Sequence, residues 1–229
     1  MPSRIEAVTT CVNYSDYLRH TIPFTLREID HLTVVTTPDD KATAEVCRNA
    51  KGERAKVKIV TTDKFSQGGG RFNKGAALNV GFNAMKREGW VLHLDADVIL
   101  PYWFGPSLDK INLNPEVMYG AMRCNICSWH FYKTWLTGGC HPLKGILSGD
   151  SKENGRSVMG FFQLFHPSAS ALRGQPPSQW YSEKYRYANT SDTDFSKKWK
   201  RQEVLPLAVV HLGPNDCTNW GGRKSPKFG

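Results

Sequence analysis

The chain has 229 residues, of which 40% are hydrophobic and 22% charged, an ordinary composition for a globular protein with one sizeable core. No stretch is apolar for the length that a membrane span needs, and residues 1–6 lack an apolar signal region, so we expect a cytoplasmic protein. A net charge of +9 favours anionic partners such as nucleotides, nucleic acids or an acidic membrane surface. The six cysteines are widely spaced and do not indicate a disulfide framework.

The first part of the chain predicts alternating strands and helices, a pattern typical of a parallel, doubly wound sheet. Residues 13–16 are expected to form the turn before the first helix. The expected elements are a strand at Ile5 to Val12, a helix from about Tyr17, a strand at Leu32 to Thr36, a helix at Lys41 to Asn49 and a strand at Val57 to Thr61.

A glycine-rich basic loop at 67–75 leads into a helix expected at Lys74 to Arg87, with Asn73 as its cap. Arg71 and Lys74 stand at the positive end of this helix, so the loop is a candidate phosphate cradle. The loop lacks the ending of a P-loop and the Gly-x-Gly-x-x-Gly of a dinucleotide site. The alternative interpretation is a mobile surface connection.

The segment from Trp90 to Pro101 is apolar except where Asp95 and Asp97 interrupt it after His93. The apolar run predicts one buried central strand. Two carboxylates one residue apart repel each other, and burial adds to the cost, so they need a cation. Mg²⁺ or Mn²⁺ suits carboxylate oxygens and completes its shell with substrate phosphates. The alternative is a pair of solvated aspartates, or aspartates paired with Lys or Arg, at the end of the strand.

The second part of the chain is less regular, and 125–156 is expected to be rich in loops. The tail at 214–229 is basic and is expected to be mobile. The remaining predicted elements are strands at Tyr119 to Cys124 and Met159 to Phe165, a helix at Asp192 to Trp199, and a strand at Val204 to Leu212 that delivers His211.

A second constellation, Cys124-x-x-Cys127 followed by His130, Cys140 and His141, is a possible structural zinc site. The chain has one such Cys pair, and Cys124 falls on a predicted strand. Buried, reduced cysteines are therefore the simpler interpretation.

Two segments, Phe72 to Ala84 and Leu94 to Pro101, resemble glycosyltransferases of the GT-A fold, most of all the β-1,4-galactosyltransferase family and family 2 relatives such as chondroitin polymerase. Those enzymes have a similar Phe-Asn-(Arg/Lys)…Leu-Asn-Val-Gly-Phe helix and an Asp-x-Asp strand that ends in Pro. The resemblance implies an α/β GT-A (Rossmann-like) fold, with a mostly parallel sheet flanked by helices. It also implies a single domain over 1–229, with a nucleotide-sugar half at about 1–115, an acceptor and catalytic half at about 116–213, and the tail.

The resemblance further implies a metal-dependent, inverting transfer of a sugar from a nucleotide-sugar, first of all a UDP-sugar, to a saccharide or other hydroxyl acceptor. Mn²⁺, or Mg²⁺ in its place, would be bound by Asp97 and His211, with Asp95 on the metal or the donor. The family's acidic catalytic stretch corresponds to residues 191–194, which makes Asp192 the expected base and Asp194 its substitute.

The family's donor site corresponds to residues at the ends of the first two strands and on the matching helix and strand. Two departures stand out: Ala208 replaces a methionine metal ligand, and Ser191 replaces the glutamate before the base. The residues expected to contact the donor are Asn13, Asp39, Asp40, Arg71, Asn73, Lys74, Asn79 and Asp95.

Two other functions compete with this interpretation. A sugar-phosphate nucleotidyltransferase would need a glycine-rich signature directly after the first strand, where this chain has Val12 to Ser15. A nucleic-acid-binding module would suit the net charge, yet the basic residues are scattered and no nucleic-acid motif occurs. We therefore expect a nucleotide-sugar and not a nucleic acid as the partner.

Overall fold

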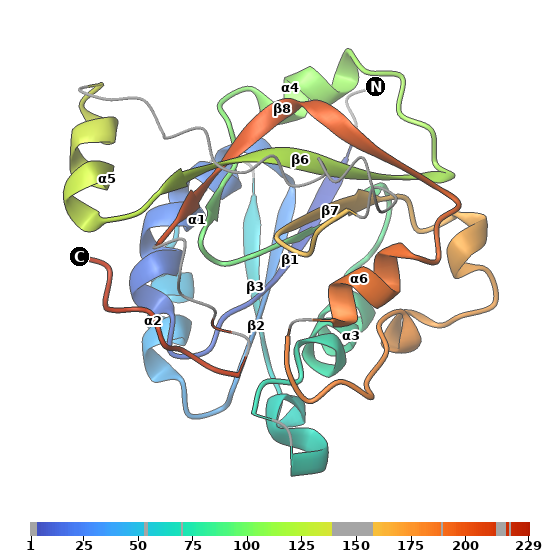
Figure 1. The fold of residues 1–229 in the computed structure, drawn as a ribbon, viewed down its shortest axis with the longest axis horizontal. Helices are drawn as coiled ribbons and strands as arrows, with labels where there is room; N and C mark the ends of the chain where they lie inside the picture. Colours follow the sequence, from blue (N-terminus) through green and yellow to red (C-terminus); the bar gives the residue numbers. More distant parts are fainter. Residues whose placement is uncertain are drawn as a thin grey trace.

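The computed structural model describes residues 4–52, 55–69, 71–138, 158–188, 190–213, 219 and 221–229. This part of the chain forms one mixed sheet with the strand order β3-β2-β1-β4-β7-β6-β8-β5 (Figure 1). The strands are β1 (Ile5–Thr10), β2 (His31–Thr36), β3 (Lys56–Thr61), β4 (Trp90–Leu94), β5 (Val98–Ile99), β6 (Val117–Ile126), β7 (Phe162–Phe165) and β8 (Arg201–Leu212).

Helices flank the sheet on both faces, with α1 and α2 on one side and α3 and α6 on the other (Figure 1). No helix in the described ranges is both long and apolar enough to cross a membrane. The α-helices are α1 (Ser15–Glu28), α2 (Lys41–Asn49), α3 (Lys74–Ala84), α4 (Phe104–Asp109), α5 (Trp129–Leu136) and α6 (Ser191–Ser196). The short 3-10 helices of the described residues are η1 (Lys64–Gly69), η2 (Ser170–Leu172) and η3 (Pro177–Gln179).

The strands β3, β2, β1 and β4 are parallel neighbours, which confirms the predicted α/β fold. Beyond β4 the sheet becomes mixed, because β7 is antiparallel to both β4 and β6, while β6 and β8 are parallel. α/β proteins bind ligands at the carboxyl ends of their strands. Here the carboxyl ends of β1 and β4 lie where the sheet changes from parallel to antiparallel pairing.

Burial on both faces explains the continuous apolar runs of the central strands. Neighbouring residues go to opposite faces, so that Val34 packs with α1 and α2 while Val35 packs with α3. Gly81 lets α3 approach closely, because a Cβ there would lie 2.6 Å from Val8 Cγ2 and 2.7 Å from Val35 Cγ2. The helix that precedes the two aspartates is thus held firmly on β1 and β2.

The predicted single strand from Trp90 to Leu100 is wrong, because the chain leaves the sheet at Asp95. The Val98 amide donates to the Asp95 carbonyl at 3.2 Å, which makes a turn, and β5 then pairs with β8 at the far edge of the sheet. Val98 stands opposite His211 in this antiparallel pair. The turn therefore carries Asp97 to the end of β8.

Two other expectations also need correction. The segment expected to be loop-rich contains α5, whose first turn is capped by the Ser128 hydroxyl, which accepts from the Phe131 amide. Helix α3 ends at Ala84 and does not reach Arg87, whose φ of 61° lies in the left-handed region.

The described part of the C-terminal tail, residues 219 and 221–229, is packed, which corrects the expected mobility. Arg223 makes a bidentate ion pair with Asp16 at 2.5 and 2.7 Å. The Phe228 ring is buried among Tyr17 and other aromatic side chains of α1 and α5. A basic tail is expected to be solvated, but here one carboxylate and one aromatic cluster bind it to α1.

Candidate active site

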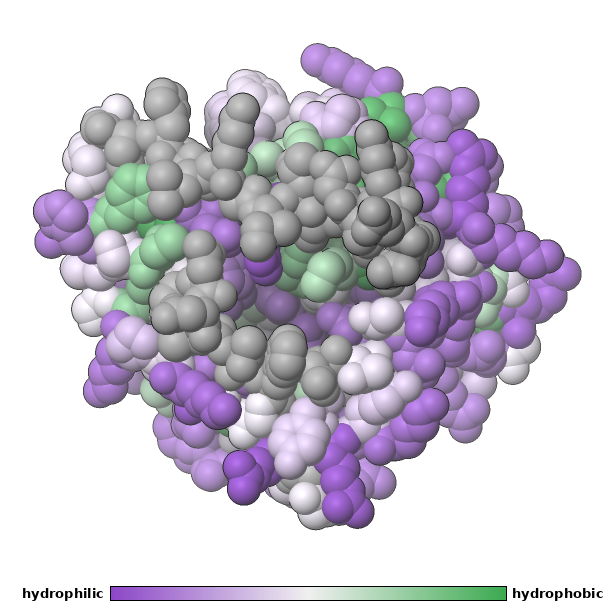
Figure 2. All heavy atoms as spheres, viewed as in Figure 1, coloured by the Kyte–Doolittle hydropathy of each residue, from purple (hydrophilic) through white to green (hydrophobic). Residues whose placement is uncertain are grey.

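A pocket of about 350 Å³ opens at the carboxyl ends of β1 and β4. Figure 2 shows that the molecule is hollowed near the middle of this face, between the C-terminal segment and the helices α3 and α6 of Figure 1. The pocket is lined by Thr10, Val12, Tyr14, Phe72, Lys74, Asp95, Ala96, Asp97, Arg123, Met159, Phe161, Ala188, Asp192, His211, Leu212, Gly213, Asn219, Gly222, Arg223 and Ser225.

Asp97 and His211, far apart in the sequence, face each other in the pocket. Asp97 Oδ2 lies 3.5 Å from His211 Nε2, and the Leu212 amide donates to the Asp97 carbonyl at 2.8 Å. Burial raises the pKa of Asp97, and the neighbouring Asp95 charge adds to this effect while His211 opposes it. The carboxylate form of Asp97 is therefore stabilised by added positive charge.

Asp95 turns to the other side, toward α3. Its Oδ1 atom accepts from Lys74 Nζ at 2.5 Å and lies 3.7 Å from His93 Nε2. Burial would raise the pKa of Asp95, but the charge and the hydrogen bond of Lys74, together with His93 and His211, outweigh burial and lower the pKa. Burial would likewise lower the pKa of Lys74, which the carboxylates around it raise instead. The buried Lys74 and the partly buried Asp95 thus form an ion pair beside Asp97.

Sequence reasoning expected three metal ligands, and the structure brings two of them together. In the described ranges no group of three or more His, Cys, Asp or Glu side chains is arranged to hold a metal. The pair that does meet fits a hard divalent cation, because Asp97 Oδ1 is buried without a hydrogen-bond partner in the same part of the chain. Such a cation needs only one or two carboxylates when substrate phosphates complete its shell.

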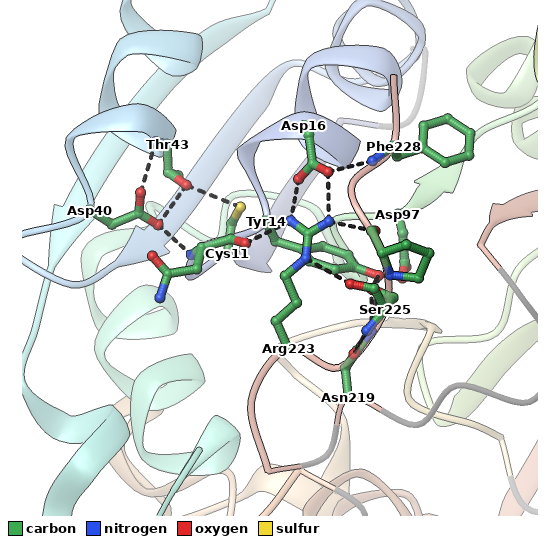
Figure 3. Close-up of polar contacts among 12 residues, drawn as sticks. Cys11, Tyr14, Asp16, Asp40, Thr43, Asp97, Asn219, Arg223, Ser225 and Phe228 are labelled. Carbon is green, nitrogen blue, oxygen red and sulfur yellow. Dashed lines mark hydrogen bonds and ion pairs between the residues drawn. The ribbon is translucent and has the colours of Figure 1, made fainter. Parts of the chain in front are cut away.

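Tyr14, between β1 and α1, supports Asp97 in the pocket (Figure 3). The Tyr14 hydroxyl donates to Asp97 Oδ2 at 3.3 Å and accepts from Asn219 Nδ2 at 3.0 Å and from Ser225 Oγ at 3.3 Å. Arg223 lies over the Tyr14 ring, with its Cζ atom 5.1 Å from the centroid. The tail thereby fixes the position of a side chain that contacts Asp97, a role that no local pattern in the sequence indicates.

Asp192 lines the pocket at the start of α6, and Asp194 does not. A Cβ at Gly160 would lie 1.8 Å from Asp192 Oδ2, so only glycine leaves room for this carboxylate. Asp194 instead lies 3.9 Å from Lys184 in an exposed ion pair. Of the two predicted bases, Asp192 is the one that the structure brings to the pocket.

A buried polar network lies behind the two carboxylates. His93 Nδ1 lies 2.9 Å from the Tyr181 hydroxyl and 3.1 Å from Gln163 Oε1, and Gln163 Nε2 donates to the Asp192 carbonyl at 3.0 Å. Burial, helped by the Lys74 charge, lowers the pKa of His93 to about 3. His93 is therefore neutral and acts as a hydrogen-bonding group in the core.

The other residues predicted to bind the donor have varied positions. Asn73 caps α3, and Asn79 is bound to the backbone of Tyr181, so both serve the fold outside the pocket lining. Asp40 caps α2 by accepting from the Thr43 amide at 3.0 Å and also accepts from the Asn13 amide at 2.7 Å (Figure 3).

Three predicted donor-binding residues are exposed and do not line the pocket: Asn13, Asp39 and Arg71. Their part in donor binding remains a prediction.

The structure describes only some of the predicted zinc ligands. Cys124 and Cys127 are free thiols of intermediate exposure, and neither belongs to a metal-binding group within the described ranges. Cys140 and His141 lie outside those ranges. Cys11 and Cys47 are buried and free, as expected for reduced cysteines.

Comparison with known proteins identifies the family. A family model described as glycosyl transferase family 2 matches residues 6–173, most of the chain. The chain belongs to this family. It is therefore a glycosyltransferase, and the predicted GT-A fold and enzyme class are confirmed. The narrower resemblance to β-1,4-galactosyltransferases and chondroitin polymerase stays a prediction.

Solved structures share the fold of this family 2 glycosyltransferase at low sequence identity. The inositol-1-phosphate CTP transferase from T. maritima has a TM-score of 0.52 at 8% identity, covering 94% of this chain and 92% of that chain. HddC from Yersinia pseudotuberculosis has a TM-score of 0.51 at 8% identity, with coverages of 92% and 93%. A weaker match, which does not by itself show a shared fold, is mouse xyloside xylosyltransferase 1, with a TM-score of 0.47 at 14% identity and coverages of 86% and 81%. No curated protein sequence matches the chain.

Proposed function

We propose that this glycosyltransferase moves a sugar from a UDP-sugar to a hydroxyl group of an acceptor, with inversion at the anomeric carbon and with the help of Mn²⁺ or Mg²⁺. One observation carries the proposal: Asp97 and His211 face each other at 3.5 Å in the pocket that Asp192 also lines. Asp97 lies in the turn between β4 and β5, His211 on β8 and Asp192 on α6, so the fold and not the sequence order assembles them.

Asp97 and His211 are the residues that would hold the cation. When bound there, the cation supplies positive charge that stabilises the departing diphosphate. Asp97 keeps its orientation through Tyr14, whose hydroxyl donates to Oδ2. Lys74 adds a fixed positive charge next to the two aspartates, and its bond with Asp95 keeps that charge in the pocket.

Asp192 is the proposed general base. Its carboxylate lies against Gly160, and its Oδ1 accepts only from the neighbouring Thr193 amide, at 2.8 Å, among the hydrogen bonds of the described residues. It can therefore accept the proton of an acceptor hydroxyl that attacks the anomeric carbon. A direct attack on the face opposite the diphosphate needs one base and no enzyme nucleophile, and it inverts the configuration.

The pocket draws on both halves of the chain. Lys74 and Asp97 come from the half assigned to the donor, and Asp192 and His211 come from the half assigned to the acceptor and catalysis. We place the nucleotide at the end of β1, where Val12 and Tyr14 line the pocket, because ligands of α/β sheets bind beyond the carboxyl ends of strands.

A thermal-shift screen of UDP-, GDP-, CMP- and dTDP-sugars with and without Mn²⁺ tests the donor, because a ligand that binds only the native state raises its Tm. We expect the largest shift with a UDP-sugar and only with metal. NMR of the sugar released by slow hydrolysis then reports the anomeric configuration, which should be inverted.

Equal shifts for all nucleotides, or none, would contradict the assignment of the donor. A retained anomeric configuration would contradict the role of Asp192. Formation of a nucleotide-sugar from a nucleoside triphosphate and a sugar phosphate would instead identify a nucleotidyltransferase.

A further inference from the structure

Arg123 on β6 is a pocket cation whose charge is not neutralised by the described part of the protein. The other two pocket cations have carboxylate partners, Lys74 with Asp95 and Arg223 with Asp16. Among the described residues Arg123 makes no ion pair, and its Nε atom is buried without a hydrogen-bond partner. The guanidinium group therefore has unused donors at the wall of the pocket.

The Arg123 side chain is held in place by an aromatic ring. Its Cζ atom lies 5.3 Å from the centroid of the Phe161 ring, a distance typical of a cation over an aromatic face. A stacked guanidinium loses little further conformational freedom when it binds a ligand. Its planar fork of N–H groups matches the two oxygens of a carboxylate or a phosphate.

Arg123 and the proposed base contact two consecutive residues of the chain. Phe161, which supports Arg123, follows directly after Gly160, which contacts Asp192. The Arg123 guanidinium and the Asp192 carboxylate thus both lie beside the backbone of residues 160–161. Because consecutive Cα atoms lie about 3.8 Å apart, side chains that contact Gly160 and Phe161 are near enough for one acceptor molecule to reach both.

We infer that the acceptor carries a carboxylate or phosphate group, which Arg123 binds while the acceptor hydroxyl lies at Asp192. This inference rests on the proposed function, because it takes Asp192 to be the acceptor's base. Arg123 is then a residue that determines acceptor specificity, since a neutral acceptor would leave the guanidinium partly buried and unpaired.

The test compares two probes that differ only at C6, methyl β-D-glucuronide and methyl β-D-glucoside. Their affinities are measured by NMR titration on protein saturated with UDP and Mn²⁺, for the wild type and for Arg123→Gln, Arg123→Lys and the surface control Arg173→Gln. UDP affinity is measured for every variant, and circular dichroism checks the fold.

The wild type should bind the glucuronide about ten- to a hundredfold more tightly than the glucoside, as expected for hydrogen bonds between charged groups. Arg123→Gln should remove this preference and leave the glucoside affinity unchanged. Arg123→Lys, which keeps the charge and loses the fork, should retain part of the preference. Arg173→Gln should behave as the wild type.

Equal binding of the two glycosides by the wild type, or binding of neither, overturns the inference. If Arg123→Gln weakens the affinity for UDP but not the affinity for the glucuronide, the inference is also overturned. That result would assign the guanidinium to the donor diphosphate. Failure of the wild type to bind UDP with Mn²⁺ is a separate result, seen without any glycoside, and contradicts the proposed function itself.

Discussion

Gly160 allows the position of Asp192 to be tested without removing its carboxylate. A Cβ at Gly160 would lie 1.8 Å from Asp192 Oδ2 and 2.4 Å from both Cβ and Cγ of Asp192. Because non-bonded heavy atoms settle near 3.5 Å, the substitution Gly160→Ala displaces the carboxylate by about 1–2 Å. A misplacement of about 1 Å in a catalytic group costs roughly a hundredfold in rate. We therefore expect kcat to fall about a hundredfold.

The assay is the rate of sugar transfer, or of donor hydrolysis, at saturating UDP-sugar and Mn²⁺. A double-mutant cycle with Asp192→Asn separates displacement of the base from general damage, because neighbouring residues that act together are not additive. The double variant should be no slower than Asp192→Asn alone. Unfolding free energy is measured in parallel, since overpacking costs about 1–3 kcal/mol. A Gly160→Ala variant with wild-type kcat, or one that slows the Asp192→Asn enzyme further, refutes the reasoning.

Three further predictions concern stability. Lys74→Met should lower the unfolding free energy by about 1–3 kcal/mol, because it leaves the partly buried Asp95 carboxylate unpaired, and Lys74→Met/Asp95→Asn should recover part of this loss in urea denaturation. His93 has a folded-state pKa of about 3, below the ordinary 6.5, so the unfolded chain binds the extra proton. Stability should therefore fall by up to about 1.4 kcal/mol per pH unit as the pH drops from 6.5 toward 3, and the slope should be smaller in His93→Gln. Phe228→Ala should cost about 3–5 kcal/mol, because the ring is buried against α1 and α5, and an unchanged Tm would show that the tail does not pack there.

Much of the fold follows from local patterns in the sequence. The central strands β1, β2 and β4 are rich in apolar residues because both of their faces are buried, and α2 begins and ends at the predicted residues, Lys41 and Asn49. The same patterns bring the aspartate pair and Lys74 to the carboxyl end of a strand. The resemblance to glycosyltransferases, carried by two segments within residues 72–101, then leads to the family.

The remaining features depend on contacts between distant parts of the chain. The break between β4 and β5 is set by pairing with β8, so the apolar run alone suggests one strand. The packing of the tail depends on Asp16 and on the aromatic cluster of α1. Arg123 carries no signal in the sequence, because it becomes a pocket residue only when β6 lies beside Phe161. The sequence also does not distinguish Asp192 from Asp194 as the base, because the room that Gly160 leaves for Asp192 appears only in the folded chain.

The most direct test of the central claim is the affinity for Mn²⁺, measured by electron paramagnetic resonance on the UDP complex. If Asp97 and His211 jointly hold the cation, Asp97→Asn and His211→Ala should each weaken Mn²⁺ binding by about tenfold or more, and Asp194→Asn should leave it unchanged. Wild-type affinity for Mn²⁺ in both Asp97→Asn and His211→Ala would contradict the claim.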